Sequence, residues 1–339
     1  MKKLHILLAA LLALSLVCNM LFALPHLFPR PQSEAGEGGL PVIIGPEYPL
    51  AGDYAEQLGT STLHVGDANS RANYFSVHNI WTAREHTTGK GVKVGILDWC
   101  FDYENQSDYY AGFEDFTGIP IPSGQGPEHG YWMATVLREI APDAEIYALN
   151  AVSMSLSENK WVDAMVRAVD WAIEHDLDVL TLSHQRISEA AHGPWDAALE
   201  RAYAAGVVTT FLHTPHERNL MPGFMSMESW ETAGFDVNIF SYDYNTLLAF
   251  HLKQYFETPE LFTSGEEEFY HSASSTSPVL GGFVALLLEL DPDLTPDQCR
   301  EILMETSYPA HFKRTPESDA TLVPRVVDMG AAVKQLLTQ

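Results

Sequence analysis

The fold follows from a short apolar stretch at residues 92–98, which reads VKVGILD. Apart from Lys93, residues 92–97 are apolar or glycine, and such a run predicts a buried strand. Later runs of similar character span residues 145–149, 177–182 and 207–212. Strands that are buried on both faces belong to parallel sheets that helices cover.

The segments between these strands have apolar residues at helical spacing. Within residues 157–175 the apolar side chains recur at Val162, Val166 and Val169, while charged residues occupy the other faces. The remaining predicted helices occupy residues 131–138, residues 190–205, residues 278–290 and the segment that begins with a capping box at residues 295–298. The alternation of strands and helices predicts an α/β fold: a doubly wound, mainly parallel sheet with helices on both faces.

Composition narrows the class of protein. The chain has 339 residues, of which 46% are hydrophobic and 19% charged, so it can bury a large core. Its 45 Asp and Glu residues against 19 Lys and Arg give a net charge of −26. This balance argues against a nucleic-acid partner, because phosphate binding needs a basic face. The 3 cysteines, Cys18, Cys100 and Cys299, are too few for a disulfide scaffold.

The N-terminus has the pattern of an export signal. Lys2 and Lys3 precede an almost wholly apolar run over residues 4–24. A basic head and an apolar run direct export, and this run is also long enough to span a bilayer and tether the chain to a membrane. We therefore expect residues 1–24 to be an export signal or membrane anchor, with the rest of the chain extracytoplasmic, either secreted or membrane-anchored. Cleavage, lipid attachment at Cys18 and retention of the segment stay open.

The rest of the chain divides into a tether and one domain. Residues 25–70 are rich in proline, glycine and acidic residues, a composition typical of a tether. Residues 71–339 have a globular pattern without an internal repeat. The sequence therefore predicts a single α/β domain at residues 71–339. Its oligomeric state stays open.

Three polar residues stand where α/β proteins collect their chemistry, beyond the carboxyl ends of strands or at the start of a helix. Asp98 follows the first strand. His129 precedes a helix predicted from Tyr131, and Ser274 precedes the long apolar helix. Each also has an ordinary structural explanation. An acid that ends a strand is usually a turn residue or cap, a histidine before glycine usually lies in a loop, and a serine before a helix is usually an N-cap.

The surroundings of these residues resemble the subtilisin-like serine proteases. The segment GKGVKVGILD at residues 89–98 looks like the catalytic-Asp segment of that family, and ASSTSP at residues 273–278 stands where the family has TSMASP. His129 and Gly130 are similar to the start of its histidine helix. Further similar segments are IAPDAEIY at residues 140–147, AIEHDLDVLTLS at residues 172–183, LTPDQCREIL at residues 294–303 and RVVD at residues 325–328. The resemblance runs from Asn79 to Val333, in the order Asp, His, Ser known from subtilisin.

The resemblance implies a serine endopeptidase that acts on a peptide or protein substrate, and the N-terminal pattern predicts that it is exported. We expect no cofactor. The resemblance also implies that Ser274 is the nucleophile, that His129 takes its proton, and that Asp98 orients the imidazole and stabilises the imidazolium. The strand that ends at Ser183 corresponds to the strand that flanks the substrate, so Ser183 is expected to be a substrate-binding residue.

The chain departs from the family where the oxyanion is stabilised. The family's oxyanion asparagine follows a strand, but here the strand at residues 207–212 leads into HTPH, and no asparagine occurs before Asn219. The substitute donors that the sequence offers are His213 and Thr214. In subtilisin itself, removal of this asparagine lowers kcat by roughly 10²- to 10³-fold.

Glycines of the family pattern are also replaced. Ser272 stands before the nucleophile segment, Gln185 follows the substrate-flanking strand, and Trp99 and Cys100 stand where a glycine follows the catalytic Asp. These departures favour a second hypothesis, a catalytically impaired protein with a protease fold that binds peptides or regulates another protein. A third hypothesis is an esterase at the same serine, although the lipase-like GxSxG motif is absent.

We expect no metal site. The segment that often carries a calcium loop in the family is short here, from Thr135 to Ile140. The acidic clusters Glu114–Asp115 and 266–268 are expected to lie on solvated faces. The histidine pairs His213/His216 and His184/His192 lack a third ligand.

Overall fold

The structure is a computed structural model of the chain. Several sequence expectations concern positions outside the residues that it describes, namely the export segment 1–24, Gln185, His213, the acidic run 266–268 and Ser272. The described residues are 63–64, 78–120, 129–153, 155–183, 187–188, 191–212, 214, 216–220, 224–226, 237–239, 273–309, 312–313 and 325–339.

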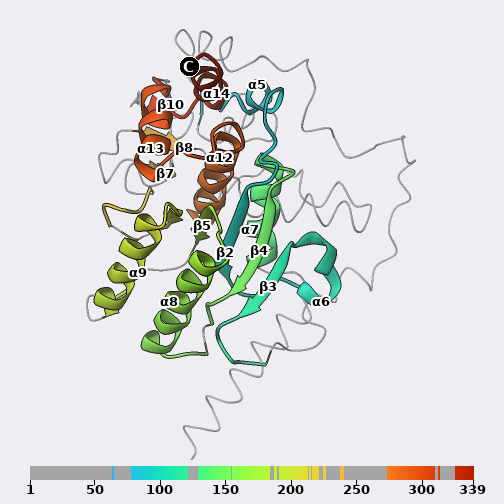
Figure 1. The fold of residues 1–339 in the computed structure, drawn as a ribbon, viewed down its shortest axis with the longest axis vertical. Helices are drawn as coiled ribbons and strands as arrows, with labels where there is room; N and C mark the ends of the chain where they lie inside the picture. The colour runs from blue at the N-terminus through green and yellow to red at the C-terminus, as the bar shows by residue number, and fades with distance from the viewer. Residues whose placement is uncertain are drawn as a thin grey trace, which may run out of the picture. The chain divides into compact units, whose positions relative to one another are not determined.

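A five-stranded sheet lies at the centre of the described fold (Figure 1). Its strands are β2 (Lys93–Asp98), β3 (Gly112–Asp115), β4 (Glu145–Asn150), β5 (Val179–Leu182) and β6 (Val208–Phe211). All of them run parallel, in the order β3-β4-β2-β5-β6. Within this sheet the central strand β2 comes first along the chain. β3 and β4 follow on one side of it, and β5 and β6 on the other. The predicted doubly wound parallel sheet is therefore confirmed.

The central strand β2 contributes to a hydrophobic core on each face of the sheet. Val94 and Ile96 pack into the core on one face, and Leu97 packs into the core on the other. Gly95 alternates with them, and a Cβ at this position would lie 2.6 Å from Cδ2 of Leu180. Only glycine leaves room for that leucine, so the strand is buried on both faces as its sequence predicts.

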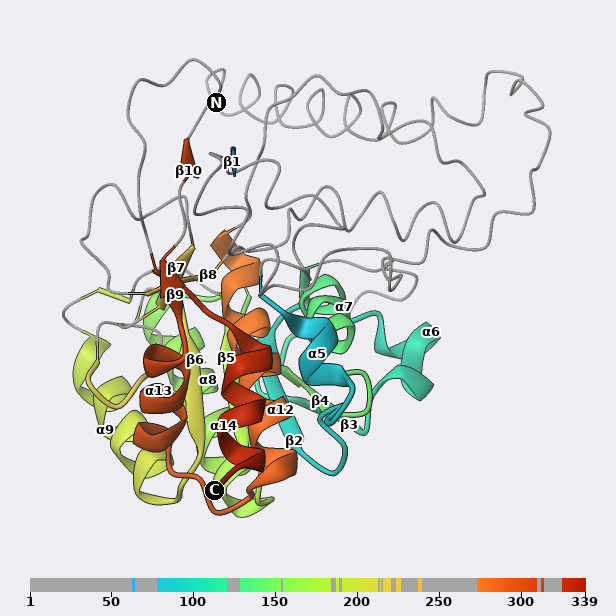
Figure 2. The same cartoon turned by 90° about the horizontal axis from the view of Figure 1, so that it is seen from above.

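Helices cover both faces of the sheet (Figures 1 and 2). The helices on one face are α5 (Ile80–Arg84), α7 (His129–Ile140), α12 (Thr276–Leu290), α13 (Pro296–Glu305) and α14 (Met329–Leu337). The helices on the other face are α8 (Glu158–Glu174) and α9 (His192–Ala204), which lie side by side. No helix within the described ranges is both long and apolar enough to cross a membrane.

The helix predictions differ from the structure mainly at helix starts. α7 begins at His129 itself, two residues before the predicted start, and α12 begins at Thr276 instead of Pro278. The capping box is confirmed, because the hydroxyl of Thr295 accepts from the N–H of Gln298 and the Gln298 side chain accepts from the N–H of Thr295. The first residues of these helices, His129–Gly130 and Thr276–Ser277, are not apolar and so carry no helical periodicity, which is why the apolar pattern misses them.

The sequence did not predict β3 or the short turns before it. β3 is an edge strand whose residues are half-buried or exposed, so it lacks the apolar run that marks the central strands. The short helical segments before it are α6 (Tyr103–Gln106) and η2 (Ser107–Tyr109).

Short strands form two smaller sheets. Their members are β7 (Phe224–Ser226), β8 (Val237–Ile239), β11 (Arg325–Val326) and β9 (Tyr308–Pro309) in one sheet, and β1 (Leu63–His64) with β10 (Phe312–Lys313) in the other. β1 belongs to the segment expected to be a tether, and it pairs in parallel with β10. Part of that segment therefore contributes a strand to the fold.

The helix α12 approaches its neighbours closely because it contains two adjacent glycines. A Cβ at Gly281 would lie 2.5 Å from Cγ2 of Thr181 on β5, and a Cβ at Gly282 would lie 2.7 Å from Cβ of Ile140 on α7. This packing holds the helix that follows Ser274 directly against the sheet.

We expect Gly281→Val to lower the free energy of unfolding by about 1–3 kcal/mol, because the added methyl groups overpack the contact with β5. Denaturant titration measures this change. The matched control is Gly193→Val on α9, where a Cβ meets nothing within 4 Å and the expected change is within about 0.5 kcal/mol. Equal stabilities of the two variants would contradict the packing argument.

Candidate active site

Asp98 ends the central strand and is almost completely buried, with 1% of its surface exposed. Its Oδ1 accepts from the backbone N–H of Trp99 at 2.8 Å. A buried carboxylate is costly unless it is paired, so its position requires further donors. The next donor comes from the first residue of α7.

That donor is His129. Nδ1 of the imidazole lies 2.9 Å from both carboxylate oxygens of Asp98. Since an ionised carboxylate only accepts, Nδ1 carries the proton and donates it, which leaves Nε2 as the nitrogen that takes up a proton. The side chain of His129 is 17% exposed, so the pair lies at the edge of the buried region.

The environment of His129 changes its pKa in two opposing ways. Burial disfavours the charged imidazolium and lowers the pKa, whereas the negative charge of Asp98 and its hydrogen bond raise it. The net effect is a pKa above the ordinary value for histidine. Asp98 therefore makes the imidazole a stronger base than burial alone would allow.

An indole ring covers one face of this imidazole. Trp99 and His129 are stacked, with ring centroids 4.4 Å apart and planes 8° apart. Trp99 and Cys100 stand where the subtilisin-like proteases have a glycine after the catalytic Asp, but nothing in the sequence predicts the contact between Trp99 and His129. It arises because the turn after β2 returns towards the start of α7.

Gly130 makes this turn possible. Its N–H donates to the carbonyl of Trp99 at 2.8 Å, and a Cβ at Gly130 would lie only 2.5 Å from the same carbonyl oxygen. Any larger residue would push the turn after β2 away from α7. The glycine of the His-Gly pair noted in the sequence is therefore required by the close approach of two backbones.

Ser274 lies in η6 (Ala273–Ser275), directly before α12, and hydrogen bonds from two strands hold this region. The Ser183 hydroxyl donates to the carbonyl of Ser274 at 2.6 Å. The Ser277 hydroxyl accepts from the N–H of Leu182 at 3.0 Å and donates to the carbonyl of Thr210 at 2.5 Å. The start of α12 is thus tied to the carboxyl ends of β5 and β6.

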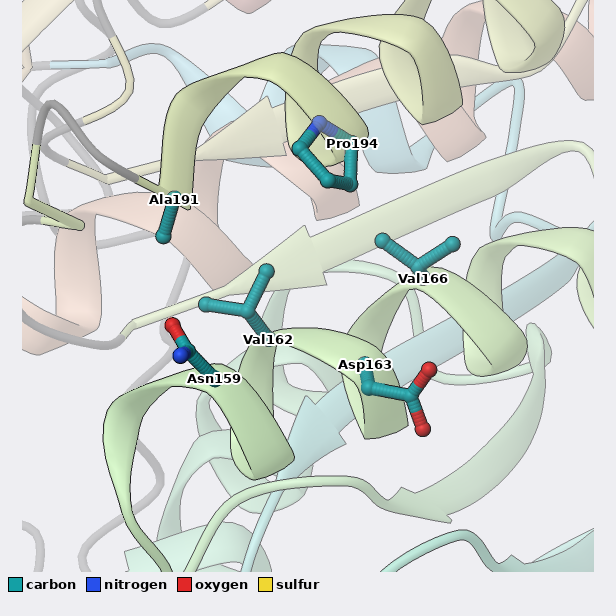
Figure 3. A pocket seen from close by; sticks show the side chains of 6 residues that line it. All are labelled: Asn159, Val162, Asp163, Val166, Ala191 and Pro194. Carbon is teal, nitrogen blue, oxygen red and sulfur yellow. The ribbon is translucent and has the colours of Figure 1, made fainter.

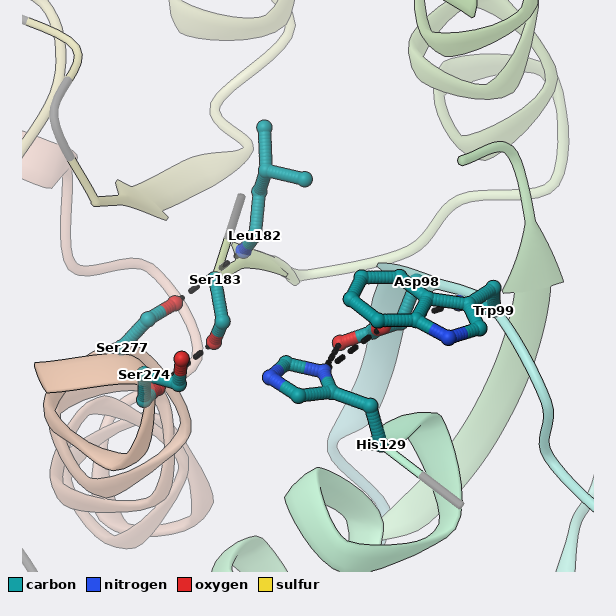
Figure 4. Close-up of polar contacts among 7 residues, drawn as sticks. All are labelled: Asp98, Trp99, His129, Leu182, Ser183, Ser274 and Ser277. Atoms are coloured by element: carbon teal, nitrogen blue, oxygen red, sulfur yellow. Dashed lines mark hydrogen bonds and ion pairs between the residues drawn. The ribbon is translucent and has the colours of Figure 1, made fainter. Parts of the chain in front are cut away.

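Figure 4 shows how these groups are arranged. Asp98 lies on one side of the His129 ring, and Ser183 and Ser274 are drawn on the other side, which the second ring nitrogen faces. The structure therefore brings Asp98 and His129 into direct contact and places Ser274 at the neighbouring helix start. The Ser183 side chain holds the backbone of Ser274.

Asn219 has a structural role. It is fully buried, and Nδ2 donates to the carbonyls of Phe211 at 2.7 Å and Thr214 at 2.9 Å. Its Oδ1 accepts from the N–H of Phe211 at 2.8 Å. Because both N–H groups are used within the loop after β6, Asn219 has no donor left for an oxyanion.

Asp115, one of the acidic residues at the end of β3, is also engaged within the fold. Its Oδ1 accepts from the N–H and hydroxyl of Thr117 at 3.0 and 2.7 Å and from Nδ2 of Asn150 at 2.7 Å. In the part of the chain that the structure describes, no three His, Cys, Asp or Glu side chains are grouped so that they could hold a metal ion. Cys299 is a buried free thiol.

A separate pocket of about 220 Å³ lies between α8 and α9 (Figure 3). Its walls are apolar, from Val162, Val166 and Ala191, and its rim includes Asn159 and Asp163. None of the residues around His129 lines it. The pocket is therefore a feature distinct from the Asp98–His129 pair.

Comparisons with known proteins identify the fold. No family model and no curated protein sequence matches the chain. Solved structures do match, among them MycP1 with its N-terminal propeptide removed, at 17% identity and a TM-score of 0.50, covering 77% of this chain and 96% of that one.

Two further matching structures have similar scores. One is a protease from Pseudoalteromonas arctica PAMC 21717, at 15% identity and a TM-score of 0.50, covering 76% of this chain and 94% of that one. The other is the MycP3 protease from the type VII (ESX-3) secretion system, at 15% identity and a TM-score of 0.50, covering 80% of this chain and 91% of that one. The chain has the subtilisin-like α/β fold in a divergent form.

The contact between Asp98 and His129 predicts a pH dependence. We expect the His129 imidazole to titrate above the ordinary histidine pKa of about 6.5 and to titrate at lower pH in Asp98→Asn, because the charge that favours the imidazolium is gone. NMR of the ring signals as a function of pH measures both midpoints. Asp115→Asn, which removes a carboxylate from the neighbouring part of the sheet, is the control and should leave the midpoint unchanged. A wild-type midpoint at or below that of Asp98→Asn would contradict this assignment.

Proposed function

We propose that the chain is an exported serine endopeptidase in which Asp98, His129 and Ser274 act together. The observation that carries the proposal is the contact of Nδ1 of His129 with both oxygens of buried Asp98 at 2.9 Å. The subtilisin-like fold supports it, since Ser274 stands at the start of a helix tied to the same edge of the sheet. The proposed substrates are peptides or proteins.

The proposed reaction begins with attack by Oγ of Ser274 on the carbonyl carbon of a peptide bond. The hydroxyl proton passes to Nε2 of His129 as the carbon–oxygen bond forms, and the carbonyl electron pair moves onto oxygen. Asp98 stabilises the resulting imidazolium. The electron pair on the oxyanion then re-forms the carbonyl as the carbon–nitrogen bond breaks, and His129 gives its proton to the leaving nitrogen. The same imidazole next takes a proton from a water molecule that attacks the acyl-serine, and returns it to Oγ of Ser274 as the ester bond breaks.

Stabilisation of the oxyanion is proposed to come mainly from the start of α12. Backbone N–H groups at a helix N-terminus carry partial positive charge and favour a nearby anion. The side chain of Asn219 does not contribute, because its amide is used within its own loop. Hydrolysis is therefore expected to be slower than in proteases that have the asparagine.

The engagement of Asn219 also favours a second candidate function, a protein with a protease fold that binds peptides but hydrolyses them very slowly or not at all. In both functions Ser183, at the end of β5, is proposed to lie beside the bound peptide. The two differ in whether the Ser274 hydroxyl is reactive.

Labelling with a fluorophosphonate probe tests the reactivity of Ser274. We expect the full chain to be labelled and Ser274→Ala to lose the label completely. Ser275→Ala is the matched control and should keep the label, because Ser275 is fully buried and its hydroxyl has no hydrogen-bond partner among the described residues. An unlabelled wild-type chain would exclude the endopeptidase and favour the peptide-binding function.

Digestion then distinguishes a peptidase from an esterase. An endopeptidase cleaves casein or a peptide library, and the cleavage is lost together with the label in Ser274→Ala. Label without peptide cleavage, but with hydrolysis of a simple ester, would favour the esterase.

Export is proposed from the basic head and apolar run of residues 1–24. We expect a chain with a C-terminal tag to be found outside the cytoplasm and a variant without residues 2–24 to remain inside. Deletion of residues 25–47 from the proposed tether removes a segment of equal length and should not prevent export. The mass of the exported chain and its extraction from membranes distinguish cleavage from anchoring. Equal export of both deletion variants would refute the assignment.

A further inference from the structure

Trp99 lies flat against one face of the imidazole that the proposed mechanism uses. The ring centroids of Trp99 and His129 are 4.4 Å apart, and the planes differ by only 8° (Figure 4). Trp99 is only partly buried, so the contact lies at the edge of the core. The contact matters because the ring that Trp99 covers is the proposed catalytic base.

Two backbone hydrogen bonds hold Trp99 in this position. Its N–H donates to Oδ1 of Asp98 at 2.8 Å, and its carbonyl accepts from the N–H of Gly130 at 2.8 Å. The residue after it, Cys100, has a φ of 57°, in the left-handed region that non-glycine residues rarely adopt. The backbone of Trp99 is therefore hydrogen-bonded to the carboxylate of Asp98, which contacts the imidazole, and to Gly130, the residue that follows His129.

We propose that Trp99 is a positioning residue for His129, which keeps the imidazole oriented towards Ser274 and stabilises the imidazolium formed during catalysis. This inference rests on the proposed function for its effect on catalysis. The contact of the two rings and its effect on the titration of His129 do not depend on that function.

The physical basis of the proposal has two parts. A flat ring against the imidazole opposes rotation out of the plane in which Nδ1 meets Asp98, and a misplaced base lowers the rate of proton transfer. The negative face of the indole also attracts a cation more than it attracts a neutral ring, so it favours the protonated imidazole.

The groups drawn around the imidazole come from β2, the turn after it, the residue after β5, and η6. Asp98 at the end of β2 supplies the negative charge that acts on the ring, and Trp99 follows it in the turn. Figure 4 draws Ser183, which directly follows β5, and Ser274 of η6 on the opposite side of the ring, where the Ser183 hydroxyl donates to the Ser274 carbonyl. A test of Trp99 therefore has to keep Asp98 in place and to vary the aromatic face alone.

A second stack of the same kind provides an internal control. Trp171 lies in α8, and His175 directly follows that helix. Their ring centroids are 3.8 Å apart and their planes differ by 18°. The carbonyl of His175 accepts from Nζ of Lys93, the first residue of β2, whereas Asp98 is the last residue of that strand. The two stacks thus lie at opposite ends of β2, and loss of the Trp171 ring should not affect His129.

The experiment compares Trp99→Phe with Trp99→Leu in the full chain. Both keep an apolar cover over the imidazole, but only Phe keeps an aromatic face, so the comparison separates the stack from burial. We expect the midpoint of the His129 titration, measured by NMR, to fall by about 0.5–1 pH unit in Trp99→Leu and by less in Trp99→Phe. The rate of fluorophosphonate labelling should fall about tenfold or more in Trp99→Leu, with partial rescue by Phe.

The controls make the outcomes decisive. Trp171→Leu should leave both the His129 midpoint and the labelling rate unchanged. If Trp99→Leu fails to fold, as judged by thermal unfolding, Trp99→Met replaces it, since Met has apolar volume without a ring. A midpoint and labelling rate that are unchanged, or lowered equally by Phe and by Leu, would overturn the proposal.

The titration separates this inference from the proposed function. If the wild-type chain is not labelled, the protease function fails, and the His129 midpoints of the Trp99 variants still show whether the indole acts on the imidazole. If the wild-type chain is labelled and the midpoints of the Trp99 variants equal the wild-type value, the function stands and the role of Trp99 is refuted.

Discussion

A carboxylate that is buried at the end of the central strand is the constraint on which the site depends. Asp98 is 1% exposed, and an unpaired charge at that depth would be strongly unfavourable. The fold meets this requirement with the N–H of Trp99 and with Nδ1 of His129. The contact with Asp98 also orients the imidazole and raises its pKa against the lowering effect of burial.

The helices on the same face are positioned around this pair by close backbone approaches. Gly130 lets α7 start against the turn after β2, and Gly281 lets α12 lie directly on β5. The hydroxyl of Ser277 joins α12 to β5 and β6. Small residues thus let α7 begin against the turn after Asp98 and let α12 pack on β5, and larger apolar residues supply the core.

The sequence predicted the elements that have a strong period or a fully buried run. The apolar residues of β2 and the helical spacing of α8 are local patterns, and both elements were found where they were expected. The edge strand β3 was missed, because its half-exposed residues follow no such pattern. The starts of α7 and α12 were placed too late because their first residues, His129–Gly130 and Thr276–Ser277, carry no apolar period, so the sequence did not show that His129 itself belongs to a helix.

The amino-acid sequence by itself determined the α/β class, the order of Asp98, His129 and Ser274, and their places next to strands and helix starts. These properties depend on periodicity and on short segments of chain. Only the tertiary structure decided that Asp98 meets His129, that the amide of Asn219 is used within its own loop, and that Trp99 covers the imidazole. Each of these is a contact made by turns beyond the strands, and the direction of a turn depends on what its backbone packs against.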